Sequence, residues 1–191
     1  RSNPDAYDDH SDAVIAKMHK AISIIQFKLE GQDILAHPEY EMEDRLLLDK
    51  LDLERGALRI GGQEYPLKDT NFPTIDPTSP YALSPEEAKV IEGLVSSFVN
   101  CEKLQRHIEF IYKKGSMYKY YNNCLMFHGC IPMEPDGGFT TLNVYGDICS
   151  GKSLFDCCER LARQGRYGEE GSEERRRGCD FMWYLWCGAK S

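Results

Sequence analysis

Long apolar runs are missing from this sequence: the longest, Phe181 to Cys187, has seven residues. A helix that crosses a bilayer needs about 20 apolar residues, so we expect no membrane-spanning segment. The sequence also lacks a basic, apolar leader of the kind that directs export. Both absences indicate a cytoplasmic protein without a membrane partner.

A surplus of basic residues is missing too. The chain carries 31 acidic and 23 basic residues, a net charge of −8. Proteins that bind nucleic acid present a basic face, so we expect no nucleic-acid partner. The short basic run Arg175–Arg177 directly follows Glu173 and Glu174, and this pattern indicates a solvated, self-neutralised loop.

Cysteine is plentiful, but the paired CxxC spacing is absent from all eight positions. A chain of 191 residues can bury a core without disulfide bonds, so we expect reduced and mostly buried thiols. A zinc site remains an alternative, because Cys124, His128 and Cys130 would share one face of a strand. No fourth ligand is evident for it.

Apolar residues at helical spacing predict amphipathic helices in the first half of the chain. One runs from Asp12 to Glu30 and ends at Gly31. A second begins at Ser84, which can form a capping box with Glu87, and a third continues after a break near residue 100. The expected buried face of the second helix consists of Ala88, Ile91, Leu94, Val95 and Phe98.

Strand patterns alternate with these helices. Short β-type runs at 44–67 predict one or two hairpins, and the proline-rich stretch 69–83 predicts an irregular loop. Residues 117–127 end apolar on both faces, which predicts a single strand at the centre of a sheet. We expect the rest of the chain to form a turn at Gly137-Gly138, a strand through Tyr145, a helix from about Ser153 to Arg163, a charged loop and a final buried strand at Phe181–Trp186.

These elements predict an α+β fold in which amphipathic helices pack on a small mixed sheet. The length suits a single domain over 1–191, with residues 1–11 as a flexible lead-in. Because the chain stops directly after a strongly apolar stretch, we expect it to be a piece of a longer protein.

The segment Gly146–Ser153 matches the P-loop pattern GxxxxGKS, in which backbone amides and the lysine bind phosphates. A P-loop sheet needs several βα units after this motif. Too little chain follows Ser153 to supply them, so we expect a strand–turn–helix corner here. A nucleotide-binding site is the weaker alternative.

The stretch around His128 is a stronger chemical signal. An apolar strand delivers this histidine at its C-terminal end, and Gly129 follows at once. Such a strand holds a ligand rigidly, while glycine lets the chain turn away without covering a metal. Taken alone, the pattern leaves both a metal ligand and a structural histidine open.

The whole chain resembles the class III (Firmicutes-type) fructose-1,6-bisphosphatases. The resemblance is carried by long, ordered segments spread from end to end: MHKAISIIQFKLEGQ at 18–32, FPTIDPTSPYALSPEE at 72–87, SSFVNCEKLQRHIEFIYKKGSMY at 96–118, YNNCLMFHGCIPMEPDGGF at 121–139 and DFMWYLWCGAKS at 180–191. It implies a fragment of a layered α/β, calcineurin-like metallophosphatase that hydrolyses fructose 1,6-bisphosphate in gluconeogenesis.

The resemblance also implies a pair of divalent metals, manganese by expectation, with His128 as one ligand. Of the ligand motifs DxH, GDxxDRG, GNH(D/E), HG and GH, only HG occurs, at His128-Gly129. The chain therefore matches the central part of such an enzyme and, by itself, should bind no metal tightly. Cys124 replaces an asparagine common in the family, which weakens any role for that position.

No catalytic residue can be named. Lys119, Lys152 and Arg106 are candidates for binding substrate phosphate, although each also fits an ordinary surface position. The expected partners are a sugar phosphate and the remainder of the same polypeptide, and the oligomeric state stays open. The main alternative is a non-catalytic insertion that shapes substrate access or subunit contacts.

Overall fold

The computed structural model describes residues 12–127 and 129–188. Its helices and short strands form an α+β arrangement, as predicted. Contacts divide the chain into two compact units, Arg1–Val95 and Ser96–Ser191. No helix among the described residues is long and apolar enough to span a membrane. The predicted flexible lead-in, 1–11, lies outside the described residues.

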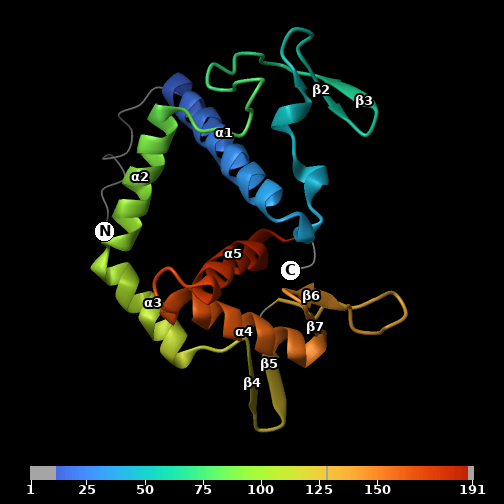
Figure 1. Cartoon of the computed structure of the whole chain (residues 1–191), viewed down its shortest axis with the longest axis vertical. Coiled ribbons are helices and arrows are strands. Elements are labelled where there is room, and N and C mark those ends of the chain that lie inside the picture. The colour runs from blue at the N-terminus through green and yellow to red at the C-terminus, as the bar shows by residue number, and fades with distance from the viewer. Residues whose placement is uncertain (1–11, 128, 189–191) are drawn as a thin grey trace. The chain divides into compact units, whose positions relative to one another are not determined.

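The first unit is built on the long helix α1 (Asp12–Ala36). Three single-turn 3₁₀ helices and an antiparallel sheet of order β1-β2-β3 follow it (Figure 1). Gly61 and Gly62 have positive φ angles of 56° and 80° and turn β2 into β3, so the predicted hairpin at 44–67 is confirmed. The bounds are η2 Pro38–Tyr40, η3 Glu43–Arg45, η4 Leu48–Lys50, β1 Leu51–Asp52, β2 Ala57–Ile60 and β3 Gln63–Pro66.

Helix α1 does not end at Gly31, and that prediction is wrong. The helix continues to Ala36, and Gly31 lies against the ring of Tyr81. A Cβ atom at Gly31 would lie only 2.0 Å from Tyr81 Cδ1, so glycine is required for close packing rather than for a helix end. The Tyr81 hydroxyl donates to Asp49 Oδ1 at 2.6 Å, and its carbonyl accepts from Gln32 Nε2 at 2.6 Å.

The start of α2 (Pro85–Val99) is held as predicted. The Ser84 N–H donates to Glu87 Oε2 at 2.8 Å, and the Glu87 N–H donates to Ser84 Oγ at 3.2 Å, which together form the capping box. The Glu87 carboxylate also accepts from Lys28 Nζ at 2.7 Å, and the Lys28 side chain is completely buried. The first turn of α2 therefore anchors α1.

The predicted buried face of α2 is wrong for the second half of the helix, while Ala88 and Ile91 are half-buried. Leu94, Val95 and Phe98 are 43%, 55% and 63% exposed, and the buried residue of α2 is Glu87. The helix break is confirmed, because α2 ends at Val99 and α3 (Glu102–Lys114) begins shortly after it.

The second unit centres on a helical hairpin of α4 (Gly151–Tyr167) and α5 (Glu173–Cys187). Its buried side chains include Leu154, Cys158 and Leu161 of α4 with Phe181 and Tyr184 of α5. The two helices approach each other closely at Gly165 and Gly178, where a Cβ atom on Gly178 would lie 2.3 Å from the Gly165 nitrogen. The predicted helix at Ser153–Arg163 is thus confirmed within a longer one.

Helix α5 replaces the predicted charged loop and final strand. Ser172 caps it by accepting from the Arg175 N–H at 3.2 Å, and Glu173 and Glu174 lie in its first turn, where negative charge is favourable. Short apolar runs such as Phe181–Trp186 do not distinguish a strand from a buried helix by pattern alone.

The predicted single strand at 117–127 is a two-stranded hairpin instead, β4 (Tyr118–Tyr121) and β5 (Cys124–Phe127). Asn122 and Asn123 have φ angles of 48° and 60°, and asparagine tolerates this left-handed region well enough to make a two-residue turn. The sheet has only these two strands, so neither is central, and every residue of β5 is exposed.

A second small hairpin, β6 (Leu142–Val144) and β7 (Asp147–Cys149), leads into α4, and the predicted turn at Gly137-Gly138 precedes it. Across the described residues the strands form three separate antiparallel sheets. The small mixed sheet expected from the sequence is therefore wrong for this part of the chain.

Candidate functional site

The predicted metal ligand, His128, lies outside the described residues. The structure on either side of it matches part of the prediction. Strand β5 ends at Phe127, and Gly129 has a φ angle of 85°, a left-handed conformation that glycine adopts without strain. The end of the strand at Phe127 and the glycine turn at Gly129 are confirmed, whereas the predicted burial of the strand is wrong.

The zinc alternative gains no support from the described residues, which contain no group of three or more potential metal ligands. Cys124 is exposed at the start of β5, and Cys130 lines a cavity with Cys158 of α4. Burial raises the pKa of the Cys158 thiol to about 12, so this group stays protonated at neutral pH and is a poor metal ligand.

All eight cysteines are free thiols in the structure. Burial, with a hydrogen bond between Cys157 and Cys149, raises the pKa of the Cys157 thiol to about 11. Thiol titration after denaturation without reductant should therefore count close to eight groups. A count of four or fewer would mean that a disulfide framework exists.

Lys152 lies on the first turn of α4, and its ammonium group is already paired with a carboxylate. Its Nζ lies 2.5 Å from Asp156 Oδ2 and 5.4 Å from the centre of the Tyr118 ring. The hydrogen bonds that the ammonium makes with Asp156 and Tyr118 raise the pKa of Lys152, so the side chain is firmly cationic. A phosphate would have to compete with the Asp156 carboxylate for it.

The other two candidate phosphate ligands lie elsewhere in the same unit. Lys119 follows Tyr118 along β4, and because side chains alternate across a strand, Lys119 points to the face opposite the one that contacts α4. Arg106 is exposed on α3. The structure therefore does not bring Lys119 and Lys152 to one site.

The other cations near the base of the hairpin also have carboxylate partners. Arg160 lies 2.7 Å from Asp147 Oδ2, and Arg163 lies 2.9 Å from Glu159 Oε1. Both arginines line a polar hollow next to Tyr118, together with Glu159 and Asp156. Its balanced charges give a doubly charged phosphate little net attraction.

The P-loop alternative fails on geometry. Strand β7 occupies the middle of the Gly146–Ser153 segment, which in a P-loop would wrap around phosphate. Tyr145 and Gly146, with φ angles of 52° and 96°, form the β6–β7 turn. The Ser153 hydroxyl accepts from the Ser150 N–H at 2.9 Å and closes the start of α4. The start of the helix is confirmed, whereas the expected single turn between strand and helix is wrong, because β7 lies between the β6–β7 turn and α4.

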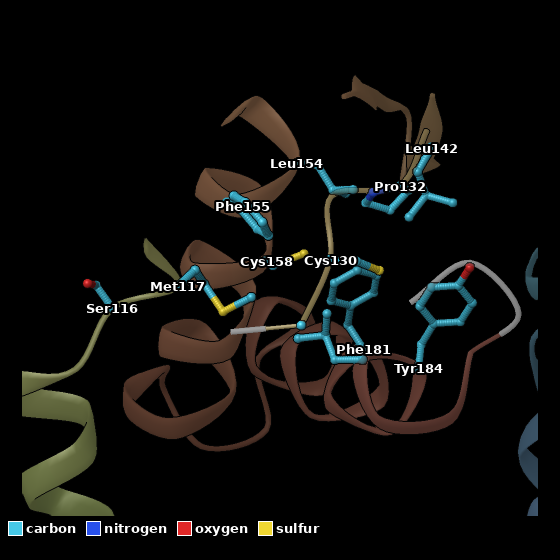
Figure 2. A pocket seen from close by; sticks show the side chains of 12 residues that line it. Ser116, Met117, Cys130, Pro132, Leu142, Leu154, Phe155, Cys158, Phe181 and Tyr184 are labelled. Atoms are coloured by element: carbon cyan, nitrogen blue, oxygen red, sulfur yellow. The ribbon is translucent and has the colours of Figure 1, made fainter. Parts of the chain in front are cut away.

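A cavity of about 430 Å³ lies directly beyond Gly129 and Cys130. Figure 2 shows Phe155 and Cys158 of α4 and Phe181 of α5 around it, with Met117 beside them. No lysine or arginine is among the described residues that line it, so it offers no counter-charge to a sugar phosphate. Its lining fits an apolar group.

Sequence reasoning missed two structural features: the buried Lys28–Glu87 pair in the first unit and the Gly165–Gly178 contact in the second. Lys28 could be recognised only by its position among the apolar residues of α1. Across residues 12–127 and 129–188 we assign no catalytic residue.

Comparison with known proteins identifies the relatives of the chain. A sequence model of the Firmicute fructose-1,6-bisphosphatase family matches residues 1–191. The fructose-1,6-bisphosphatase class 3 of Clostridium novyi (strain NT) is 53% identical over 178 residues, covering 93% of this chain and 27% of that protein. The class 3 enzyme of Clostridium tetani (strain Massachusetts / E88) is 52% identical over 181 residues, covering 94% and 27%. The chain thus spans about a quarter of the length of these curated relatives, and no solved structure gives a significant match.

Proposed function

Because the chain belongs to the Firmicute fructose-1,6-bisphosphatase family, we propose that it is part of an enzyme that hydrolyses fructose 1,6-bisphosphate to fructose 6-phosphate and phosphate. The observation that carries this proposal is the family match over all 191 residues, with relatives more than half identical. We place the reaction in gluconeogenesis and in the cytoplasm on the same ground.

We further propose that the whole enzyme uses divalent metal, manganese by expectation, with His128 as a ligand. The described residues do not form a metal site by themselves, since they hold no cluster of three or more potential ligands. The remaining ligands would come from the part of the polypeptide outside this chain. No catalytic step is assigned to a metal on the basis of the described residues.

Binding of the substrate phosphates would also need cations other than Lys119, Lys152 and Arg106. Lys152 is paired with Asp156, and Lys119 lies on the other face of the hairpin. The cavity beside Gly129 is apolar. We therefore propose that this chain supplies a ligand and a supporting framework, while other segments supply most of the substrate site.

The proposal is tested by phosphate release from fructose 1,6-bisphosphate, using the full-length gene product and the 191-residue chain in parallel with added manganese. The full-length protein should turn over substrate. The 191-residue chain should show no activity above its own His128→Ala variant, because a single histidine cannot hold the metals that the family resemblance implies.

Two results would contradict the proposal in different ways. Turnover by the short chain well above the His128→Ala control would show that the chain is catalytic on its own. A full-length protein that releases phosphate equally well with and without His128→Ala would favour the second candidate, a non-catalytic insertion that shapes substrate access or subunit contacts. The charge pairing of Lys152, Arg160 and Arg163 is the observation that favours that candidate.

A further inference from the structure

Strand β5 (Cys124–Phe127) has the composition of an interior strand but lies at the edge of a two-stranded sheet. In its register with β4, Tyr118 opposes Phe127 on the face toward α4, and both rings lie near Phe155, at 6.1 Å and 5.8 Å between centroids. Only this base of the hairpin is covered. Figure 1 shows the rest of β4 and β5 extending away from α4.

The exposed part of the hairpin is largely apolar on both faces, with Lys119 as the one charged side chain of the two strands, opposite Met126. On the face toward α4, Tyr120 and Leu125 are 65% and 51% exposed beyond the helix. On the opposite face, Tyr121 and Met126 are 61% and 45% exposed. Strands that are apolar on both faces are typical of sheets that are covered on both sides.

The two edges of the hairpin differ. Strand β4 carries Lys119, and a charged residue is a common device against unwanted pairing of an edge strand. Strand β5 has no charge and no proline, so its outer edge is unprotected. A two-stranded hairpin alone is at best marginally stable in water. The arrangement favours an additional strand next to β5.

We propose that the outer edge of β5 pairs with a strand from the rest of the same polypeptide, so that β5 becomes an interior strand with both faces covered. This inference rests on the proposed function, in which the chain is part of a longer enzyme. The chain covers 27% of the curated relatives, so about three quarters of their length is outside it and can supply the partner strand and the covering layers.

A second copy of this chain is a poorer occupant. Pairing β5 with β5 of another copy would cover the edge but leave Tyr121 and Met126 on one face and Tyr120 and Leu125 on the other in water.

The pairing of β5 with a strand from the rest of the polypeptide has a consequence for the proposed chemistry. His128 directly follows β5 in the sequence, so fixing β5 in a sheet would fix the point from which this residue extends.

Cys124 is a built-in reporter for this proposal. It is exposed at the start of β5 in the present structure, opposite Tyr121. In the folded full-length protein, maleimide labelling of Cys124, measured by peptide mass spectrometry, should be at least about 100-fold slower than in the same protein unfolded in guanidinium. A rate within about threefold of the unfolded rate would overturn the proposal.

Backbone exchange identifies the edge directly. In a two-stranded antiparallel sheet only alternate amides of β5 bond to β4, whereas a third strand satisfies the others. Residue-resolved hydrogen exchange of the full-length protein should therefore show all the amides of 124–127 protected. Rapid exchange at alternate positions would mean that no strand is added. Protection of Cys124 that depends on protein concentration would instead indicate a second copy and would also overturn the proposal.

A substitution gives an independent readout. Met126→Lys in the full-length protein should lower Tm by at least about 5 °C, because it would place a second positive charge opposite Lys119 on a covered face, whereas Met126→Leu should lower it by less than about 2 °C. Equal melting of both variants would contradict a covered face. The failures remain separable: an active enzyme with a reactive Cys124 refutes only the added strand, and an inactive protein with Cys124 protected refutes only the function.

Discussion

Lys28→Met should lower the free energy of unfolding of the first unit by about 3–5 kcal/mol, the usual cost of removing one partner from a buried ion pair. The Lys28 side chain is completely buried, and its Nζ donates to Glu87 Oε2 at 2.7 Å and to the Thr74 carbonyl at 2.5 Å. Methionine fills similar space but leaves the Glu87 carboxylate without its cation. Urea unfolding followed by circular dichroism should show the loss.

Lys20→Met is the matched control, because Lys20 lies on the same helix and pairs with Asp69 at the surface. Exposed pairs contribute about 0–1 kcal/mol, so this variant should unfold nearly as the wild type does. The double variant Lys28→Met/Glu87→Gln should recover at least about 1 kcal/mol, since it removes the stranded charge. Equal losses from Lys28→Met and Lys20→Met would show that the buried pair contributes little.

The same pair sets a pH dependence. Burial alone would raise the pKa of Glu87, but hydrogen bonds from Lys28 and the Ser84 N–H outweigh it and hold the pKa below its usual value. The stabilisation from ionised Glu87 is therefore fully present above the unfolded-state pKa of about 4.3, and it is lost as the pH falls through the lower folded-state pKa.

The sequence predicted those elements whose local chemistry is decisive. The capping box at Ser84 and Glu87, the hairpin within 44–67 and the helix over Ser153–Arg163 all lie where side-chain hydrogen bonds or positive φ angles leave few alternatives. Errors arose where tertiary packing decided the outcome. Gly31 was interpreted as a helix end, but the structure requires glycine there because the Tyr81 ring packs against it.

The two apolar runs show the same limit. The run at Phe181–Trp186 was predicted as a strand, yet the Ser172 cap and the contact of Gly178 with α4 place it in a helix. The run ending at Phe127 was predicted as one long strand because two left-handed asparagines were not recognised as a turn. Apolar composition predicts burial, and it does not distinguish burial within this chain from burial against another segment.

The candidate site was predictable only in part. The glycine turn after β5 follows from residue type, and Gly129 has the expected positive φ angle. The separation of Lys119 from Lys152 cannot be predicted from residue type, because it depends on the register of β4 and on the contact of Tyr118 with α4. Assignment of phosphate ligands needs those contacts.

His128→Ala in the full-length protein should lower kcat/KM for fructose 1,6-bisphosphate at least about 100-fold. Loss of groups that merely support a metal ligand commonly costs 10–100-fold, so loss of a ligand itself should cost no less. Phosphate release measures the effect. Metal analysis of the purified variant should also show less bound manganese than the wild type, which an indirect structural role would not produce.

His107→Ala and His37→Ala are the matched controls and should retain activity within about threefold. His107 is exposed on α3, and the His37 ring stacks on Tyr40 at 4.7 Å and lies 2.9 Å from Glu39 Oε1, so neither is placed as a ligand. With metal removed, His128→Ala should melt within about 2 °C of the wild type, because the imidazole would then have no metal to bind. Activity that survives the substitution, or a metal-free variant that is grossly unfolded, would make His128 a structural histidine and would refute the proposed ligand.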